Sequence, residues 1–524
     1  MISFEARPGG VADVTADLLV LPWYAGAGDQ DGAGARPEPE PGPAAGEVTT
    51  AMGHELASAL AAHGFTGAPG ETFRTLTLGR LAASSLLCLG LGPRAEAEPG
   101  AVRQAVLLAG EAIAGYGRVA IVLPLAPPAH AESPSASKAG AEPIAAALAE
   151  GLELAAYGFG RYRHDPRWRP PALAHVQVLT GAGPHAPDLA AVSAGLHRGA
   201  AVARLTNWVR DLVNASPSDT TPELMAQQAR ALAGDHGLEC RVLGRPELMD
   251  GGFGGILAVG QGSRNEPRLV ELSYRGGDGP VLGLTGKGIT FDSGGLTLKR
   301  TAEIEWMKAD MAGAATIMAV LRGAAEAGLP VNIDAALPFA ENMPGGSAQR
   351  PGDVLTHRGG MTSEVRDTDS EGRLVVADAL AYLAERAPAL LVDVATLTDA
   401  AGLGPGLWAV LGNDDRLAGE LVTAGLEAGD PGWALPLPPA YRRYLDSTVA
   451  DIRNTPTEGA DTTLMAAMYL RDFAAGVPWA HIDNGSTAFL EHQAGGWPEG
   501  ATGSPVRALL RWLEWYSPAW RDRP

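Results

Sequence analysis

The chain has 524 residues, too many for one ordinary domain, and predicts two to four domains with a large buried core. Lysine and arginine number 40 against 60 acidic residues, and the net charge of −20 argues against nucleic acid or an anionic membrane as the main partner. Two cysteines exclude a disulfide framework and a zinc site built mainly on thiolates. Because no secretory signal and no membrane-spanning apolar run is visible, we expect a cytoplasmic protein.

We expect residues 1–190 to form the smaller of two α/β domains. Three apolar runs, at 17–24, 84–92 and 118–125, have the composition of buried strands. The apolar positions of 101–117 follow the spacing of an amphipathic helix.

Two segments interrupt this first domain, near 26–48 and near 124–142. Both hold glycine, proline, alanine and acids with almost no large apolar residue. Such a composition buries too little surface to offset the entropy lost on ordering, so we expect linkers or disordered insertions there. A connecting helix at 191–204 and a catalytic domain at 205–524 complete the expected organisation.

The second half of the chain alternates strands and helices. Thr221 and Pro222 have the chemistry of an N-cap and a first helical position, so a helix should begin there. The other expected elements are helices at 222–237, 303–327 and 374–386, strands at 281–285, 331–338 and 390–397, and a glycine-rich loop at 341–353. This alternation predicts a mostly parallel central sheet flanked by helices, with ligands at the carboxyl ends of its strands.

Charged residues follow these strands. Asp369 and Glu371 are two residues apart, so in an extended segment both face a common centre. Asp310 lies on an apolar stretch of the expected helix 303–327, where a carboxylate is costly unless paired or bound to metal. The whole set comprises four carboxylates, two lysines and an arginine: Lys287, Asp292, Lys299, Asp310, Asp369, Glu371 and Arg373.

This set suits a centre of two divalent cations. Two metals about 3.5–4 Å apart require several carboxylate oxygens, and a bound metal lowers the pKa of water toward about 7. One lysine can be held neutral as a ligand, a second can stabilise an oxyanion, and an arginine can hold a small anion. A phosphate-binding loop is excluded because Val281 and Gly288 stand where glycine and a hydroxyl residue are required.

Four segments together resemble the leucyl (cytosol) aminopeptidase family: GKGITFDSGGLTLK, MKADMAGAA, ENMPGG and DTDSEGRLVVADAL. The resemblance covers 205–524 closely and the first domain more loosely. It implies a metal-dependent aminopeptidase with two divalent ions per subunit, commonly zinc, manganese or magnesium. It further implies a cytoplasmic homohexamer that acts on peptides.

The resemblance also implies roles for each residue. A metal-bridging hydroxide would attack the scissile carbonyl, while Lys299 stabilises the oxyanion and Arg373 anchors a bicarbonate that moves the proton. One metal would be held by Lys287, Asp292, Asp310 and Glu371, and the other by Asp292, Asp369 and Glu371.

The chain departs from the family pattern at two positions near the site. Asp367 stands where the family usually has asparagine, and Asp399 where it usually has glycine. Asp399 resembles a position that, with Met307 and Thr396, lines the pocket for the first substrate side chain. A carboxylate there would favour arginine, lysine or a small residue over leucine, unless it faces solvent or pairs locally.

Other functions stay open at this stage. A dipeptidase is the nearest alternative, and substrate length would separate it from a general aminopeptidase. Some relatives bind DNA as regulators, which the net charge of −20 argues against. A scaffold without activity is a further alternative, although all seven candidate site residues are in place.

Overall fold

The computed structural model describes residues 1–12, 14–26, 38–53, 55–125, 140–165, 171–181, 186–456 and 461–516. The chain divides into two compact units. One comprises Met1–Arg204 with Gly495–Trp497, and the other Leu205–Ala494 with Pro498–Pro524. The boundary after Arg204 falls inside α7 (Leu189–Asn214), the helix that contains residues 191–204.

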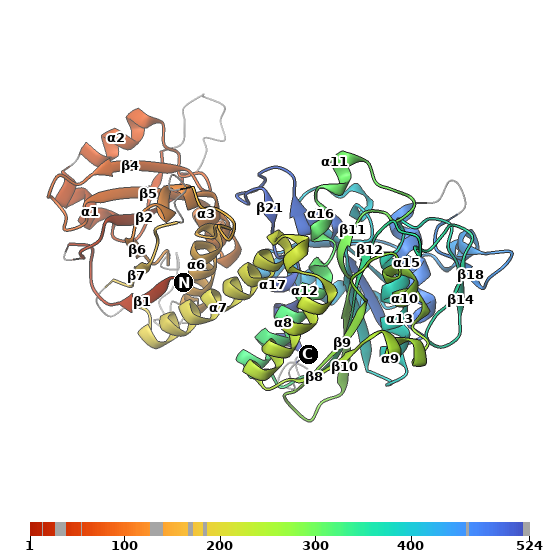
Figure 1. The fold of residues 1–524 in the computed structure, drawn as a ribbon. Helices are drawn as coiled ribbons and strands as arrows, with labels where there is room; N and C mark the ends of the chain where they lie inside the picture. The colour runs from red at the N-terminus through yellow and green to blue at the C-terminus, as the bar shows by residue number, and fades with distance from the viewer. Residues whose placement is uncertain are drawn as a thin grey trace. The chain divides into compact units, whose positions relative to one another are not determined.

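The N-terminal unit is built on a seven-stranded sheet (Figure 1). Its neighbouring strands pair in parallel except where β4 meets β5 and where β3 meets β2. The strand order is β1 (Ser3–Arg7), β7 (His175–Leu179), β6 (Arg118–Val122), β2 (Leu18–Ala25), β5 (Ser85–Pro93) and β4 (Thr72–Leu76), with β3 (Glu40–Pro41) beside β2.

Both faces of this sheet are covered, which explains why its central strands are apolar without alternation. On β2, Leu18 and Val20 pack on one side, against a core that also holds buried residues of α3 (Pro99–Leu108) and α6 (Ala141–Ala155). Leu19 and Leu21 pack on the other side, with residues of α1 (Ala45–Met52) and α2 (Glu55–His63).

Two expectations for this unit were wrong in part. The helix expected over 101–117 is two helices, α3 and α4 (Gly110–Ala114), because the chain leaves α-helical geometry at Ala109 before a glycine. Residues 40–41 and 45–48, expected to be linker, form β3 and the start of α1, since Ala45 and Val48 are buried in the core. Residues 141–142, at the end of the second expected insertion, begin α6, and residues 27–37 and 126–139 of the two insertions lie outside the described residues.

The larger unit contains a nine-stranded mixed sheet. Its centre is parallel: β10 pairs in parallel with β12 and β15, and β15 with β19. Antiparallel pairs lie toward its edges. The strand order is β17 (Gly432–Ala434), β16 (Trp408–Gly412), β19 (Trp479–Asp483), β15 (Leu390–Ala395), β10 (Val281–Gly286), β12 (Asn332–Asn342), β9 (Arg268–Arg275) and β8 (Glu239–Leu243), with β11 (Gly288–Asp292) beside β12.

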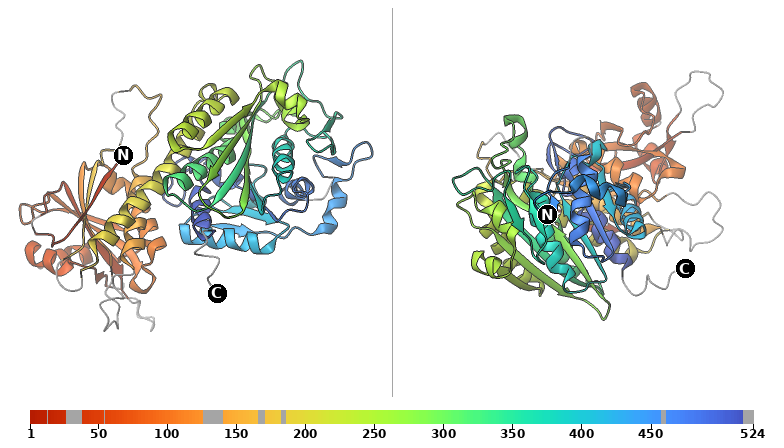
Figure 2. Two further views of the ribbon diagram at one scale, coloured as in Figure 1. Left: turned by 90° about the horizontal axis from the view of Figure 1, so that it is seen from below. Right: turned by 90° about the vertical axis from the view of Figure 1, so that its right-hand side faces the viewer.

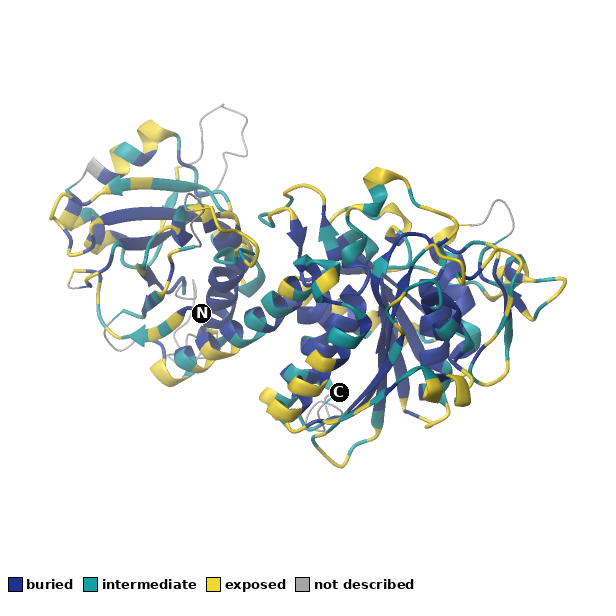
Figure 3. Cartoon of the chain, in the orientation of Figure 1, coloured by how far each residue is buried: buried dark blue, intermediate teal, exposed yellow. Residues whose placement is uncertain are grey.

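Helices cover both faces of this sheet, as expected (Figure 2). One face carries α8 (Pro222–His236), α12 (Ala312–Glu326), α14 (Asp415–Ala428) and α17 (Val506–Trp515). The other carries α10 (Gly254–Gly260), α13 (Gly372–Ala384) and α15 (Thr462–Phe473). The central strands are buried, and exposed residues gather on the outer helix faces (Figure 3). Within the described residues, no helix is long and apolar enough to cross a membrane.

Shorter elements connect these layers. Two small sheets pair β13 (Val354–Thr356), β14 (Thr362–Glu364) and β18 (Ile452–Arg453), and β20 (Phe489–Leu490) with β21 (Gly500–Ala501). The remaining elements are α9 (Arg245–Asp250), α11 (Thr301–Ile304), α16 (Gly485–Ala488), and the short 3₁₀ segments at Arg94–Glu96, Pro217–Asp219, Met307–Ala309, Ala400–Gly402 and Pro439–Leu445.

The helix predicted to begin after Thr221 is confirmed. The Thr221 side chain accepts a hydrogen bond from the Leu224 amide, and α8 ends before Gly237, which has a positive φ of 68°. The single helix expected over 303–327 is wrong. Residues 301–311 instead form α11, a 3₁₀ turn and a break, and the α-helix begins only at Ala312, so Asp310 precedes it.

Candidate active site

The site lies where the central strands of the larger unit end. Lys287 directly follows β10, and its amide donates to the Val394 carbonyl of β15. Its ammonium lies 2.7 Å from Asp310 Oδ1, 2.8 Å from Glu371 Oε1 and 3.0 Å from the Thr396 carbonyl oxygen. Burial would lower the pKa of Lys287, but the surrounding carboxylates raise it above its ordinary value.

Two glycines allow this approach of strand and helix. A Cβ on Gly313, in the first turn of α12, would lie 2.0 Å from the Val394 carbonyl oxygen. One on Gly286 would lie 2.4 Å from the backbone of Gly313. Any larger residue at either position would therefore push α12 away from the ends of β10 and β15, and would disturb the contact of Asp310 with Lys287.

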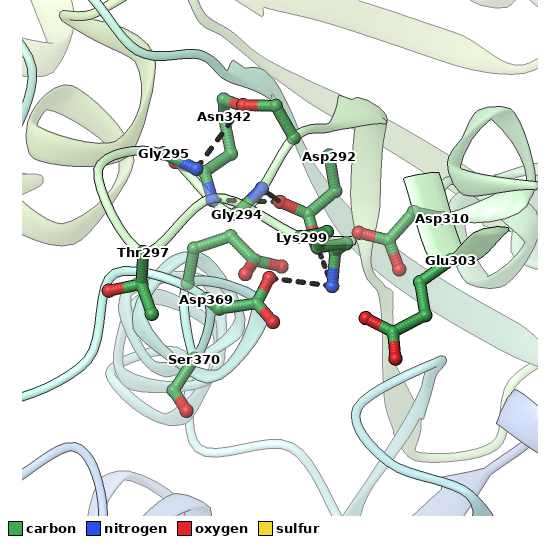
Figure 4. A network of polar contacts seen from close by, with 12 residues as sticks. Asp292, Gly294, Gly295, Thr297, Lys299, Glu303, Asp310, Asn342, Asp369 and Ser370 are labelled. Atoms are coloured by element: carbon green, nitrogen blue, oxygen red, sulfur yellow. Dashed lines mark hydrogen bonds and ion pairs between the residues drawn. The ribbon is translucent and has the colours of Figure 1, made fainter. Parts of the chain in front are cut away.

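Asp292 ends β11 and is held from two directions. Its Oδ1 accepts hydrogen bonds of 2.8 Å from the Gly294 amide and from Asn342 Nδ2. Its Oδ2 lies 2.9 Å from the ammonium of Lys299, which is also 2.6 Å from Asp369 Oδ1. Figure 4 shows the Lys299 ammonium between these two carboxylates.

Asp369 and Glu371 approach from the segment that leads into α13. The carboxylates of Asp369, Glu371 and Asp292 each offer an oxygen within 4.8 Å of the others, so these three can share one cation. Asp310 faces the same centre, where its Oδ1 also accepts a hydrogen bond from Thr396 Oγ1 at 2.7 Å. The structure thus brings together all four predicted carboxylates and both predicted lysines.

The acids of this centre repel one another. Burial and the charge of Asp292 raise the pKa of Asp369 to about 7, even though Lys299 opposes the shift. Burial, reinforced by Asp292, also raises the pKa of Glu371, and burial raises the pKa of Asp310 well above its usual range. Four carboxylates facing two ammonium groups leave excess negative charge, which bound cations would relieve.

The residues fit a pair of divalent metal ions. Asp310 Oδ2 and Glu371 Oε2 are buried and have no hydrogen-bond partner among the described residues. A buried carboxylate oxygen without a partner is unfavourable, and metal ions bound by these two oxygens would remove that cost.

A cavity of about 280 Å³ opens onto this centre. Met307 and Thr396, both predicted to line the substrate pocket, do line it, together with Trp306 and Phe489. Asp399 is exposed and is not among the lining residues, so the structure does not bring it to this cavity. Two acids that the sequence did not single out, Glu303 and Glu491, line it instead, and Figure 4 shows Glu303 near Asp310.

Arg373 lies in the first turn of α13 and is buried. Its Nη1 donates to the Asn454 carbonyl oxygen at 2.7 Å, while Nε has no hydrogen-bond partner among the described residues. Burial lowers the pKa of this guanidinium. An arginine with an unused buried donor is a reasonable anchor for a small anion.

Asp367 has a local role that the sequence did not predict. Its Oδ1 accepts from the Asp369 amide at 2.9 Å and its Oδ2 from Ser370 Oγ at 3.2 Å. The carboxylate thus closes the turn that carries Asp369. Asn342 was also missed, although its place at the end of β12, where site residues were expected, was the signal that could have found it.

The sequence matches a known family in both units. Residues 207–510 match the catalytic domain of the cytosol aminopeptidase family, and residues 35–166 match its N-terminal domain. The chain is 40% identical over 98% of its length to the "Probable cytosol aminopeptidase" of Streptomyces coelicolor, covering 98% of that protein. The counterpart in Roseiflexus castenholzii is 41% identical over 86% of this chain and 91% of its own.

Solved structures agree with the sequence match. The bottromycin maturation enzyme BotP in complex with Mn is 36% identical, with a TM-score of 0.79 over 95% of this chain and 99% of that one. A tomato leucine aminopeptidase variant is 26% identical, with a TM-score of 0.83 over 98% and 96%. With both domains matched and the charged centre in place, the chain belongs to the cytosol aminopeptidase family of metal-dependent peptidases.

Proposed function

We propose that this protein releases N-terminal residues from peptides at the charged centre of its larger unit, using two divalent cations. The observation that carries the proposal is the convergence of Asp292, Asp369 and Glu371 within 4.8 Å, beside an open cavity. One ion would be held by Lys287, Asp292, Asp310 and Glu371, and the other by Asp292, Asp369 and Glu371. When bound, the two ions would supply a nucleophilic hydroxide and polarise the scissile carbonyl.

Manganese is the first metal to test, because a similar structure is described in complex with Mn. Zinc and magnesium are the other candidates. Lys287 must lose its proton to become a ligand, because an ammonium group has no lone pair to offer. The carboxylates that hold this proton in the metal-free protein are the same ones that the cations would occupy.

Two cationic side chains would assist the reaction from fixed positions. Lys299 is held at the cavity by Asp292 and Asp369, where its ammonium would donate a hydrogen bond to the substrate carbonyl oxygen as negative charge develops. Arg373 would hold bicarbonate or a similar anion through its unpartnered Nε, and that anion would accept and return the proton.

We further propose that the first-residue preference is shifted from leucine toward cationic side chains. Trp306, Met307 and Phe489 provide apolar walls for an aliphatic stem, and the exposed Glu491 provides a carboxylate at the cavity. Glu303 is less suited to this role because Arg300 neutralises it. The test is the ratio of kcat/KM for Arg and Leu anilides: Glu491→Gln should lower it, and Asp399→Gly should leave it unchanged.

The proposed activity is tested with chelator-treated protein and a panel of aminoacyl anilides and dipeptides. Added Mn²⁺, Zn²⁺ or Mg²⁺ should restore hydrolysis in the wild type, and Glu371→Ala should remain inactive. Hydrolysis confined to dipeptides would identify a dipeptidase instead. Absence of hydrolysis from folded protein that binds the metal would contradict the proposed function.

We propose a location and an assembly on the basis of the relatives. Their description as cytosol aminopeptidases supports a cytoplasmic protein, and the family resemblance supports a homohexamer. Peptides are the proposed partners. Nucleic acid is not, since the net charge of −20 opposes binding to phosphate.

A further inference from the structure

The segment 366–373 carries three residues of the proposed centre and has no regular structure before α13 begins at Gly372. Asp369, Glu371 and Arg373 all depend on its path. A loop that holds repelling carboxylates will move unless its backbone is fixed from outside. The contacts that fix it therefore decide how well the centre is formed.

One side of the segment is fixed from the centre itself. Thr368 Oγ1 donates to the Gly294 carbonyl oxygen at 2.7 Å, and Asn342 Nδ2 donates to the Thr368 carbonyl oxygen at 2.9 Å. Asn342 Nδ2 also donates to Asp292 Oδ1, so this side chain links the segment directly to a carboxylate of the centre.

The other side is fixed by Asn454, which follows β18 and is fully buried. Its Oδ1 accepts from the amides of Arg366 and Asp367, at 2.8 and 3.4 Å. Its Nδ2 donates to the carbonyl oxygens of Asp367 and Ser370, at 2.7 and 3.3 Å. The side-chain amide thereby accepts two hydrogen bonds and donates two, and all four are made to this one segment.

The backbone of Asn454 completes the arrangement. Its carbonyl oxygen accepts from Arg373 Nη1 at 2.7 Å, and its amide donates to the Glu364 carbonyl oxygen at 3.0 Å, which extends the pairing of β18 with β14. Asn454 is therefore anchored to a small sheet and holds both ends of the segment that presents the two acids.

Resting on the proposed function, we propose that Asn454 is a positioning residue of the peptidase centre. It touches neither the four carboxylates nor the cavity, and acts by fixing the backbone that aims Asp369, Glu371 and the Arg373 guanidinium. Residues that orient metal ligands in this way typically change metal affinity or activity by about 10–100-fold when removed.

The test compares Asn454→Ala and Asn454→Ser with a matched control, Asn332→Ala. Asn332 is also buried and also bridges loop backbone, to Gly277 and Gly279, but at the opposite end of β12. Mn²⁺ affinity is measured by calorimetry on folded protein, alongside kcat/KM and the thermal midpoint. We expect Asn454→Ala to weaken Mn²⁺ binding and lower kcat/KM by about 10-fold or more. Asn454→Ser should show a smaller loss, and Asn332→Ala should lose thermal stability only.

Wild-type Mn²⁺ affinity in both folded Asn454 variants would overturn the proposal. So would failure of both to fold while Asn332→Ala folds, because Asn454 would then serve the stability of the whole unit. The metal measurement does not depend on peptide hydrolysis. Weaker Mn²⁺ binding in a protein that hydrolyses no peptide would therefore refute the proposed function while leaving the positioning role intact.

Discussion

Lys299 and Lys287 have the same charge but different surroundings. Both lysines line the cavity, but Lys287 is buried against Asp310 and Glu371, whereas Lys299 is 13% exposed. Because of this exposure, Lys299 is the lysine that we propose to contact a substrate. Burial opposes the shift, but the nearby carboxylates raise the pKa of Lys299 above its ordinary value, which favours the protonated form.

Replacing Lys299 by alanine should lower kcat by about 100- to 1000-fold, because one fixed donor to the developing oxyanion is lost. Steady-state kinetics on the preferred anilide, with saturating Mn²⁺, measures the effect. Arg350→Ala removes an exposed cation whose partner, Asp353, does not line the cavity, and should leave kcat within about twofold of wild type. Equal losses in the two variants would contradict the role assigned to Lys299.

Metal binding should strengthen as the pH rises from 6 to 8. Asp369, whose pKa is raised to about 7, must give up its proton to bind a cation, and Lys287 must also give up its proton to become a ligand. Calorimetry in buffers of different ionisation enthalpy would show protons released on Mn²⁺ binding. An affinity that does not change across this range would mean that the acids are already ionised in the metal-free protein.

At the scale of elements, α13 is held by a buried polar network around Asp378. Asp378 accepts from the Ile256 amide at 2.9 Å and the Arg358 amide at 3.0 Å, and lies 2.8 Å from His357 Nδ1. His357 in turn contacts Ser363 and Tyr469. This network resembles a nucleophilic triad in composition, but it is fully buried and fixes the helix that follows Glu371.

Asp378→Ala should therefore destabilise the larger unit by about 3 kcal/mol, because it leaves a buried histidine and two amides without their acceptor. Urea unfolding followed by the fluorescence of buried Trp408 and Trp479 measures it. The matched control is Glu385→Ala, which breaks an exposed ion pair with Arg358 at the end of α13 and should cost at most about 1 kcal/mol. Similar costs in both variants would show that the network contributes little.

Local sequence patterns predicted the elements that depend on local physics. The cap at Thr221 and the doubly buried strands were evident from residue type and spacing. The break before Ala312 was not, because the residues around Asp310 have helical periodicity and only contacts with Lys287 and Thr396 show why the chain turns there. Asn454 was not predictable either, since its partners are backbone groups more than 80 residues away in sequence.

At the scale of the whole molecule, the proposed hexamer makes a simple prediction. Light scattering should give a mass of about six times the 54.0 kDa of one chain at neutral pH and moderate salt. Because the chain carries a net charge of −20, assembly should weaken at very low salt, where like charges are least screened. A mass of one chain under all these conditions would refute the hexamer.

Gly313 carries no chemistry, yet its missing side chain sets how near α12 comes to the end of β15. In a screen of every single substitution for activity, this position should tolerate as little change as Glu371. Intolerant positions would therefore include proposed metal ligands and also glycines that only keep elements close together. For Gly313, the 2.0 Å from an added Cβ to the Val394 carbonyl oxygen identifies the second kind. Engineering of this centre would therefore have to keep glycine at Gly313 and Gly286.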